Sequence, residues 1–246
     1  MYLIQTCVCG SSGPFVEGAV GDVVIRRCEC GVIHQATKQT REEYERQYRG
    51  DYHAAVDRHP GCVPYRERYA HDRNVAGKRW ARYRSVLHIN DGALRNALDV
   101  GCSTGAFVDY LRLQHAIDAY GVDPDPSMAR DHVYTGSVED VPLGVQRYDL
   151  ITFHDVLEHL VDPIASLRFA VRELLAPGGR VVVDVPDVST PAGHHHYKLE
   201  HLWYLTASSL IRIAGAAGLS NAEIDYPIPG KVVLCARRIA KAQAAA

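Results

Sequence analysis

The stretch Ala97-Leu98-Asp99-Val100-Gly101-Cys102-Ser103-Thr104-Gly105 joins an apolar run to the segment Ala106 to Leu111, whose apolar residues recur at helical spacing. This pattern predicts a short strand, a glycine-rich turn and the opening of a helix. Glycines at 101 and 105 allow positive φ angles and let the backbone approach a ligand closely. Ligands of open α/β sheets bind at the carboxyl ends of such strands. The stretch therefore predicts a ligand-binding junction.

The spacing of the glycines narrows the class of ligand. The dinucleotide fingerprint G-x-G-x-x-G requires glycine at 103 and 106, where this chain has Ser103 and Ala106. The observed spacing is Asp-x-Gly-x-x-x-Gly, with Asp99 two residues before the first glycine. A second apolar segment ends at Asp123, about 20 residues further on, where a carboxylate can accept both hydroxyls of a ribose.

Further motifs follow in order: Val138-Glu139-Asp140, Tyr148 to His159, and Leu175 to Arg180. Together, over roughly residues 95 to 239, the set resembles the class I S-adenosylmethionine-dependent methyltransferases. The resemblance implies an α/β, Rossmann-like fold with a seven-stranded, mostly parallel sheet, an antiparallel last strand and helices on both faces. The alternating segments predict strands at 95–100, 119–123, 132–135, 148–154, 179–186, 221–226 and 231–238, and the clearest helices at 162–176 and 206–217.

The resemblance also implies S-adenosylmethionine as the cofactor and methyl donor. It assigns to the donor Asp99, Gly101, Ser103, Gly105, Asp123, Val138, Glu139 and His154. Asp99 would engage the methionine amino group, directly or through water, and Asp123 would bind the ribose. Val138 and Glu139 are the adenine-pocket candidates, with Asp140 as the alternative side chain that reaches adenine N6.

Composition bounds the class of protein. A chain of 246 residues with 47% hydrophobic and 23% charged residues can bury a full core in one main domain. A net charge of −2 and a pI of about 6.7 argue against bulk attraction to nucleic acid or to an anionic membrane. No apolar run is long enough to span a bilayer, and residues 1–6 lack the features of a signal peptide. We expect a cytoplasmic protein whose seven cysteines are thiols or metal ligands more often than disulfides.

Residues 1–38 form a candidate cysteine-pair hairpin module. Cys7-Val8-Cys9-Gly10 and Cys28-Glu29-Cys30-Gly31 each carry two cysteines followed by glycine, and residues 15–27 between them alternate as a hairpin does. Many sugar-modifying methyltransferases have such pairs with two intervening residues, and the second pair here resembles a shortened version. Four thiolates can close a tetrahedral Zn²⁺ site, so we expect structural zinc on Cys7, Cys9, Cys28 and Cys30. The alternatives are a hairpin that has lost its metal and a reactive dithiol.

Residues 39–90 have a polar, helical pattern broken at Pro60-Gly61 and Pro64. In the resembled family this region forms a helical lid, and its aromatic residues can line the acceptor pocket. The tyrosines of this region are Tyr44, Tyr48, Tyr52, Tyr65, Tyr69 and Tyr83. We expect one or two of them to face the acceptor, with Tyr65 as the named candidate, and the others to pack the helices onto the sheet. The basic run over 66–84 is either a phosphate site or, as such runs more often are, a solvated helix face.

Methyl transfer from a sulfonium is an in-line displacement, and positioning alone offsets about 7–11 kcal/mol of the barrier in favourable cases. A hydroxyl acceptor must also lose its proton, and a general base then contributes roughly 10²–10⁴-fold. Histidine suits that role because its ordinary pKa lies near neutrality. His154 and His159 flank the end of the fourth predicted strand. His154 would begin the wall between donor and acceptor, and His159 would contact the acceptor or position the following helix.

A second group of histidines lies after the fifth strand. Tyr197 to Tyr204 resembles the Tyr-x-Glu-His-x-x-Tyr loop of sugar methyltransferases, with one extra residue before Glu200. The predicted catalytic residues are therefore His201, His154 and Glu200, and the predicted acceptor contacts are Tyr197, His159 and Tyr65. The adjacent histidines at 194–196 are a weaker metal candidate, because successive loop residues seldom point at one ion.

We therefore expect residues 91–240 to form an O-methyltransferase core, followed by a flexible tail over 241–246. Its acceptor would be a sugar, a nucleotide-linked sugar or a related small molecule in glycan or natural-product biosynthesis. The alternatives are C-methylation of a nucleotide-linked keto sugar, methylation of RNA or protein, and a methyltransferase-fold adaptor. The acidic pI argues against nucleic acid as a partner, and the oligomeric state stays open.

Overall fold

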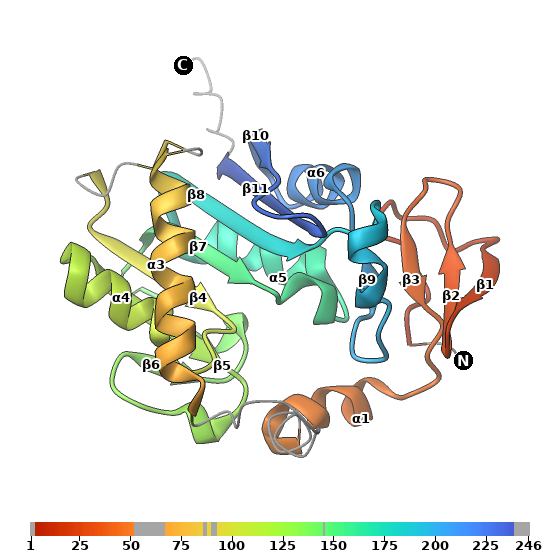
Figure 1. Cartoon of the computed structure of the whole chain (residues 1–246), viewed down its shortest axis with the longest axis horizontal. Helices are drawn as coiled ribbons and strands as arrows, with labels where there is room; N and C mark the ends of the chain where they lie inside the picture. Colours follow the sequence, from red (N-terminus) through yellow and green to blue (C-terminus); the bar gives the residue numbers. More distant parts are fainter. Residues whose placement is uncertain (1–2, 52–66, 86–87, 90–92, 145, 239–246) are drawn as a thin grey trace.

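The computed structural model describes residues 3–51, 67–85, 88–89, 93–144 and 146–238. Within these residues, the larger sheet has seven strands in the order β10-β11-β8-β7-β4-β5-β6 (Figure 1). Its strands are β4 (Asn96–Val100), β5 (Asp118–Asp123), β6 (Val133–Thr135), β7 (Tyr148–His154), β8 (Leu175–Pro186), β10 (Leu219–Asp225) and β11 (Lys231–Arg238). β11 is antiparallel to both of its neighbours, and the pairs from β8 to β6 are parallel. This arrangement confirms the predicted fold class.

Helices cover both faces of the sheet (Figure 1). They are α3 (Tyr69–Ser85), α4 (Ala106–His115), α5 (Pro163–Phe169) and α6 (Ala207–Ala216). α3 and α4 pack on one face, and α5 and α6 pack on the other. The helix expected over 162–176 is divided, because α5 continues into the π-helical turn η7 (Ala170–Leu174) and β8 already begins at Leu175.

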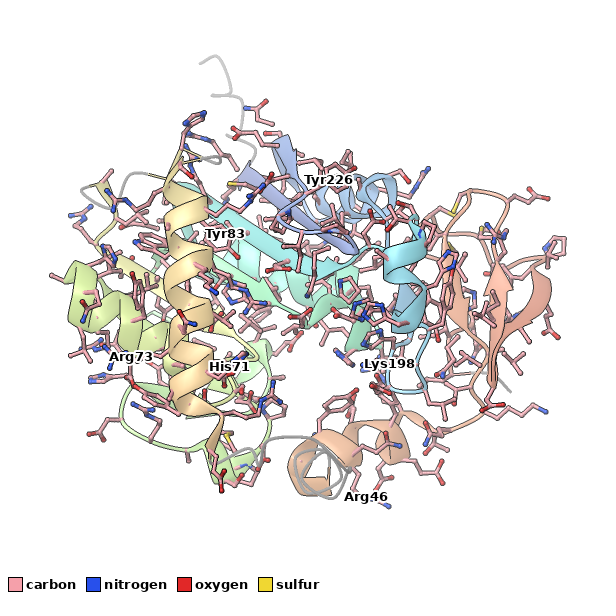
Figure 2. The ribbon with its side chains drawn as sticks, in the orientation of Figure 1. Arg46, His71, Arg73, Tyr83, Lys198 and Tyr226 are labelled. Carbon is pink, nitrogen blue, oxygen red and sulfur yellow. The ribbon has the colours of Figure 1, made fainter. Side chains whose placement is uncertain are left out.

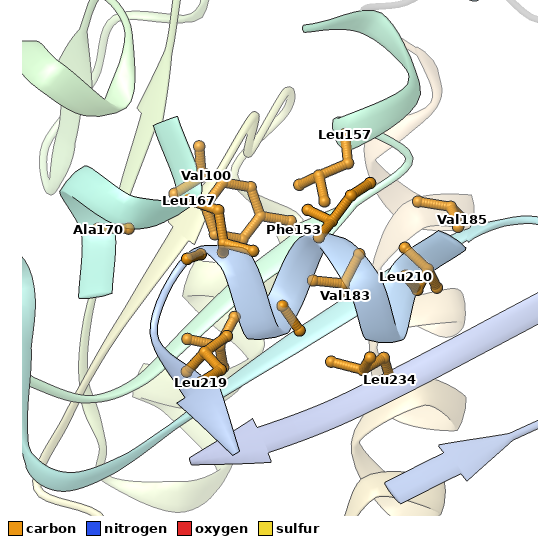
Figure 3. Close-up of a cluster of buried hydrophobic side chains, with 14 of the residues drawn as sticks. Val100, Phe153, Leu157, Leu167, Ala170, Val183, Val185, Leu210, Leu219 and Leu234 are labelled. Atoms are coloured by element: carbon orange, nitrogen blue, oxygen red, sulfur yellow. The ribbon is translucent and has the colours of Figure 1, made fainter. Parts of the chain in front are cut away.

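Alternating side chains of the strands build a core on each face. Val181 and Val183 of β8 belong to the core with α5 and α6, whereas Val182 between them belongs to the core with α3 and α4. Figure 3 shows part of the first core, where Phe153 and Leu210 pack with Val183. Successive side chains of a strand point to opposite faces, so a continuous apolar run is what a strand covered on both sides requires.

A second, four-stranded sheet lies at one end of the molecule, in the order β1-β2-β3-β9 (Figure 1). Its strands are β1 (Val16–Val20), β2 (Val23–Arg27), β3 (Ile33–Gln35) and β9 (Trp203–Tyr204). β1 and β2 form the predicted hairpin. β3 pairs with β9 from the far part of the chain, so the amino-terminal module is hydrogen-bonded to the segment that follows His201.

Short helical segments surround the carboxyl ends of the main strands. They are α1 (Arg41–Arg46), the π-helical η1 (Gln47–Asp51), and the 3₁₀ turns η4 (Pro126–Met128), η5 (Val138–Asp140), η6 (Leu157–His159) and η8 (Pro191–His196). Among the described residues, no helix combines the length and the apolar character needed to cross a bilayer.

Candidate active site

A cleft of about 1130 Å³ opens where β4, β5 and β7 end. Its walls include the segments that follow these strands, turn η5, and parts of α1, η1 and α3. Most of the residues predicted to bind the donor line this cleft: Asp99, Gly101, Ser103, Asp123, Val138, Glu139 and His154. Gly105 lies just behind them and begins α4 with a φ of 72°.

The turn after β4 depends on Gly101. This glycine has a φ of 68°, and a Cβ at its position would lie 2.4 Å from Cγ2 of Val156. Its backbone N–H donates to the Val122 carbonyl at the end of β5. The turn can therefore pack closely between Val156 and the end of β5 only because residue 101 has no side chain.

Asp99 is a buried carboxylate held by its neighbours on β7. Its Oδ1 accepts a hydrogen bond from Thr152 Oγ1 at 2.6 Å and lies 3.0 Å from His154 Nδ1. Both contacts use the same oxygen, which leaves Oδ2 for a cationic group in the cleft. The Asp99 carboxylate therefore fits the ammonium group of S-adenosylmethionine, and its burial strengthens the attraction between the two charges.

Asp123 is the second buried carboxylate of the cleft. Its Oδ2 accepts the backbone N–H of Ser103 at 2.8 Å, and its Oδ1 accepts that of Asp125 at 3.0 Å. These bonds fix the carboxylate plane at the end of β5. A carboxylate has about four acceptor positions, so ribose hydroxyls can bind in addition to the two backbone groups.

The residues predicted to form the adenine pocket lie on turn η5 and line the cleft. Val138 is buried and faces the cleft, and Glu139 accepts a hydrogen bond from Ser166 Oγ at 2.8 Å. Asp140 caps its own turn, because its Oδ2 accepts from the backbone N–H and the hydroxyl of Ser137 at 2.8 Å each. The alternative role of Asp140, contact with adenine N6, would therefore compete with this cap.

Both ring nitrogens of His154 have partners. Its Nδ1 faces Asp99, and its Nε2 lies 2.9 Å from the hydroxyl of Tyr83 on α3. Burial raises the pKa of Tyr83 well above its usual value, so this hydroxyl stays protonated and donates to His154. The imidazole ring of His154 also packs edge-on against the Phe107 ring, with the ring centroids 4.7 Å apart. The structure therefore places His154 as a support for Asp99.

Sequence reasoning missed a charged group beside the cleft. Asp155 lies between Arg79 Nη2, at 3.0 Å, and Lys231, and Arg79 Nε also contacts Asp184 at 3.0 Å. Burial raises the pKa of Asp155, but Lys231 and Arg79 outweigh it and lower that pKa to about 2. The basic run of α3 is thus more than a solvated face, because Arg79 and Tyr83 both point to the sheet (Figure 2 labels Tyr83).

His159 also lines the cleft, together with Tyr44 and Tyr48 from α1 and η1. Its Nδ1 lies 2.8 Å from the Tyr48 hydroxyl and 2.9 Å from the carbonyl oxygen of Glu200. Both tyrosine hydroxyls donate to that same carbonyl. Two of the tyrosines from the predicted lid therefore reach the cleft, whereas Tyr65 lies outside the described residues.

The loop that carries Tyr197, Glu200 and His201 stands beside the cleft, and none of these residues is among its lining (Figure 2 labels Lys198 on this loop). Tyr197 stacks on Tyr204 with ring centroids 4.6 Å apart, in the core of the smaller sheet. Glu200 uses its carbonyl rather than its carboxylate toward His159. His201 is buried, and its ring centroid lies 4.7 Å from that of His159. Burial lowers the pKa of His201 to about 2.

The four predicted zinc ligands form a compact cluster. Cys7 and Cys30 have their sulfurs 3.6 Å apart, as do Cys9 and Cys28, and all four sulfurs lie within 4.8 Å of one another. The two turns are alike: the N–H of the glycine that closes each turn donates to the carbonyl of its first cysteine. One intervening residue therefore suffices to bring both thiols of a pair to the same side.

Comparison with known proteins identifies the class. Residues 67–224 match the family model of a methyltransferase domain. This match covers more than half of the chain, so the chain belongs to that methyltransferase family. Together with the fold, this match places the chain among the methyltransferases, and the buried carboxylates of the cleft fit S-adenosylmethionine as the methyl donor.

Individual relatives are distant. The chain is 24% identical over 157 residues to a tRNA U34 carboxymethyltransferase of Idiomarina loihiensis, a match that covers 54% of this chain and 48% of the relative. It is 34% identical over 97 residues to a ubiquinone biosynthesis O-methyltransferase of Cereibacter sphaeroides, covering 35% and 38%. The chain thus spans about half the length, or less, of these curated relatives.

A solved structure extends the likeness in fold. The 1,6-didemethyltoxoflavin-N1-methyltransferase of Burkholderia thailandensis, with bound 1,6-didemethyltoxoflavin and S-adenosylhomocysteine, aligns with a TM-score of 0.56 and 19% identity. The alignment covers 90% of this chain and 98% of that one. At this identity the likeness shows the fold alone.

Proposed function

We propose that this enzyme methylates a hydroxyl of a sugar, a nucleotide-linked sugar or a related small molecule in glycan or natural-product biosynthesis. The observation that carries the proposal is the wall of the cleft built by α1, η1 and α3. This wall presents tyrosines and arginines together, namely Tyr44, Tyr48, Arg41, Arg49 and Arg68, and it also holds the acidic residues Glu45 and Asp72. Arg41 and Arg49 both pair with Glu45 on the exposed side of the wall. Guanidinium groups bind phosphates in a bidentate manner, and tyrosine rings pack against the faces of sugars and bases.

The size of the cleft supports two ligands at once. Its volume of about 1130 Å³ exceeds the roughly 300–1,000 Å³ of ordinary small-molecule sites. Asp99 and Asp123 would hold the donor, which supplies an electrophilic methyl group. The acceptor oxygen attacks that methyl carbon, the carbon–sulfur bond breaks with its electron pair left on sulfur, and the hydroxyl proton leaves the site.

The roles of the predicted catalytic residues follow from their surroundings. We propose that His154 acts through Asp99, because both of its ring nitrogens are bound. His159 and His201 would act on the acceptor, with the Glu200 carbonyl placing His159 and the His196 carbonyl placing His201. A buried imidazole whose pKa lies far below neutrality is a poor general base, so His201 needs another way to act.

Calorimetric titration tests the function directly. S-adenosylmethionine and, separately, nucleotide-linked sugars, neutral sugars and tRNA are titrated into the protein, and S-adenosylhomocysteine release is followed for each acceptor. We expect binding of the donor and of a nucleotide-linked sugar, and a product that carries the methyl group on oxygen. Arg49→Gln should weaken the nucleotide-linked sugar about tenfold without changing donor affinity. A methyl group on carbon would establish the C-methyltransferase alternative.

RNA is the second candidate acceptor, because the chain resembles enzymes named tRNA U34 carboxymethyltransferases. The arginines of the cleft wall would suit a phosphate backbone as well as a diphosphate. Release of S-adenosylhomocysteine with tRNA, and with no sugar of the panel, would overturn the sugar proposal in favour of RNA.

We also propose that Cys7, Cys9, Cys28 and Cys30 hold a structural Zn²⁺ ion. Zinc–sulfur bonds of about 2.3 Å place the ligands of a tetrahedron roughly 3.8 Å apart, close to the sulfur spacings of this cluster. Elemental analysis of freshly purified protein should find about one zinc per chain from this cluster. Its absence would favour the hairpin without metal, and cross-linking of paired thiols by mild oxidation would favour the dithiol.

A further inference from the structure

A second cluster of metal-ligating side chains lies beside the cleft. Among the described residues, Glu158, His159 and His201 bring one carboxylate oxygen and two ring nitrogens within 4.8 Å of one another. Two histidines and one carboxylate form the ligand set of many catalytic zinc and non-haem iron sites. Neither histidine belongs to the 194–196 run that the sequence singled out.

Glu158 lacks a partner that its burial demands. It is 2% exposed, and neither of its carboxylate oxygens accepts a hydrogen bond from the described part of the chain. The His159 Nε2 atom lies 4.0 Å from Oε1, beyond hydrogen-bond distance. A buried carboxyl group in a protein is hydrogen-bonded, paired with a cation, bound to a metal or kept neutral, and burial raises the pKa of Glu158 well above its usual range. A cation between Glu158 and the two rings would satisfy this group.

Both histidines are oriented as metal ligands are. His201 Nδ1 lies 2.9 Å from the carbonyl oxygen of His196, and His159 Nδ1 lies 2.9 Å from that of Glu200. A donated Nδ1–H fixes the tautomer in which Nε2 carries the lone pair. Histidines that bind metals usually donate their other N–H to a carbonyl or carboxylate in this way.

The two segments that carry the cluster are joined by direct hydrogen bonds. The Leu202 N–H donates to the carbonyl of Glu158 at 2.8 Å, and Trp203 Nε1 donates to the carbonyl of Leu160 at 2.8 Å. The cluster is therefore held from both sides. Of these three residues, only His159 lines the cleft, so an ion bound here would lie next to the acceptor side of the cleft.

We propose that Glu158, His159 and His201 bind a divalent first-row transition-metal ion whose open position takes the acceptor oxygen. Bonds of 2.0–2.2 Å place tetrahedral ligands roughly 3.4 Å apart, so the side chains close in by about 1 Å on binding. Such an ion would make the acceptor hydroxyl more acidic, so that its proton would pass to water and its oxygen would attack the donor's methyl carbon as the carbon–sulfur bond breaks. The acceptor part of this inference rests on the proposed function, whereas the metal site stands by itself.

Cobalt titration of the full chain separates the two metal sites. Co²⁺ on the four cysteines gives thiolate-to-metal charge-transfer bands, whereas Co²⁺ on nitrogen and oxygen ligands gives only weak visible bands. We expect a second equivalent of Co²⁺ that binds without thiolate bands. If the cysteines bind none, we expect a single equivalent of this kind.

Variants assign that equivalent. Glu158→Gln keeps the shape of a buried side chain and removes its charge, so it should lose the thiolate-free equivalent while the thermal unfolding temperature stays the same or rises. The matched control is His194→Gln with His195→Gln, because both side chains are exposed on the neighbouring loop. This control should keep the equivalent. Absence of thiolate-free Co²⁺ in the wild type, its survival in Glu158→Gln, or its loss in the control overturns the site.

The failure of this inference can be told from the failure of the proposed function. Binding of Co²⁺ at Glu158 with no turnover on any sugar would leave the metal site standing and overturn the acceptor class. The opposite result is turnover on a nucleotide-linked sugar by protein that binds no second equivalent of Co²⁺, at a rate that Glu158→Gln leaves unchanged. It would overturn the metal site and leave the acceptor class standing.

Discussion

Asp99 and Asp123 end adjacent strands, and each is held by atoms from another segment of the chain. Thr152 and His154 of β7 fix Asp99, and the backbone N–H groups of Ser103 and Asp125 fix Asp123. Both carboxylates therefore point into the cleft before any ligand arrives. Binding a donor then orders few side chains, which is the main benefit of preorganisation.

Replacing Asp123, the carboxylate proposed to bind the ribose, should weaken donor binding selectively. Asp123→Asn keeps the volume but removes the charge and part of the acceptor capacity, and hydrogen bonds to charged groups contribute about 1.5–3 kcal/mol. We expect S-adenosylmethionine to bind roughly 10- to 100-fold more weakly by calorimetry. The control is Asp118→Asn at the opposite end of β5, which pairs with Arg112 and should leave the affinity unchanged. Unchanged affinity in Asp123→Asn would place the ribose elsewhere.

The sequence was informative about residues whose neighbours are local. Asp99, Gly101 and Asp123 lie in motifs with a strand on one side and a turn on the other, so spacing and the family resemblance together indicated the cleft. Glu158 and Arg79 gave no such signal, because the interactions that they make are with residues far away in the chain. Asp184 lies 105 residues from Arg79, and Leu202, which binds the Glu158 carbonyl, lies beyond another strand.

At the scale of elements, apolar alternation predicted the central strands because each one buries side chains on both faces. β7 and β11 have the predicted bounds. The pairing of β3 with β9 was not predictable in this way. β9 has two residues, and its partner lies about 170 positions earlier, so neither periodicity nor turn chemistry indicates it.

The ion pairs of α3 should fasten this helix to the sheet. Arg79 contacts Asp155 and Asp184, and its removal would leave two carboxylates with Lys231 as their shared cation. Arg79→Met should lower the free energy of unfolding by about 3 kcal/mol in urea denaturation. Arg82 on the same helix has a more exposed side chain than Arg79, 35% against 25%, and pairs with one carboxylate, so Arg82→Met should cost no more than about 1 kcal/mol. Equal losses in both variants would contradict the assignment.

His34 of β3 should make stability depend on pH. Burial lowers the pKa of its imidazole, which packs edge-on against Phe15 at 5.0 Å and against Trp203. The unfolded chain therefore binds the proton more strongly. The contribution of His34 is complete above its ordinary pKa of about 6.5 and is lost as the pH falls through the lowered value.

Urea unfolding at pH 7.5 and pH 5.5 measures this effect. His34→Gln should reduce the loss of stability between the two pH values by up to about 1.4 kcal/mol, the limit for one group titrated one unit below its ordinary pKa. The control is His71→Gln on α3, whose side chain is exposed and whose replacement should leave the pH dependence as it is. If the stability of His34→Gln falls as much between pH 7.5 and pH 5.5 as that of the wild type, protonation of His34 does not destabilise the folded protein.

At the scale of the whole molecule, the smaller sheet takes one strand, β9, from the part of the chain that lies between β8 and β10 of the larger sheet. Cys7 and Cys28 are buried in the same core as Leu202 and Trp203, and β3 pairs directly with β9. Any metal held by the cysteines therefore braces the loop that carries His201. The residues proposed to bind the donor, by contrast, lie on β4, β5 and η5, away from the smaller sheet.

Loss of the cysteine cluster should thus act on the acceptor side alone. In Cys28→Ser with Cys30→Ser, we expect no bound zinc, a lower melting temperature, faster protease cleavage within residues 191–206 and at least tenfold slower turnover. Donor affinity should stay within about twofold of the wild type, because loosening β3 and β9 leaves Asp99 and Asp123 in place. Cys235→Ala, which removes a buried thiol from β11, is the control and should keep its zinc. Turnover and donor affinity that fall together would mean that the cysteine module supports the whole fold rather than the loop.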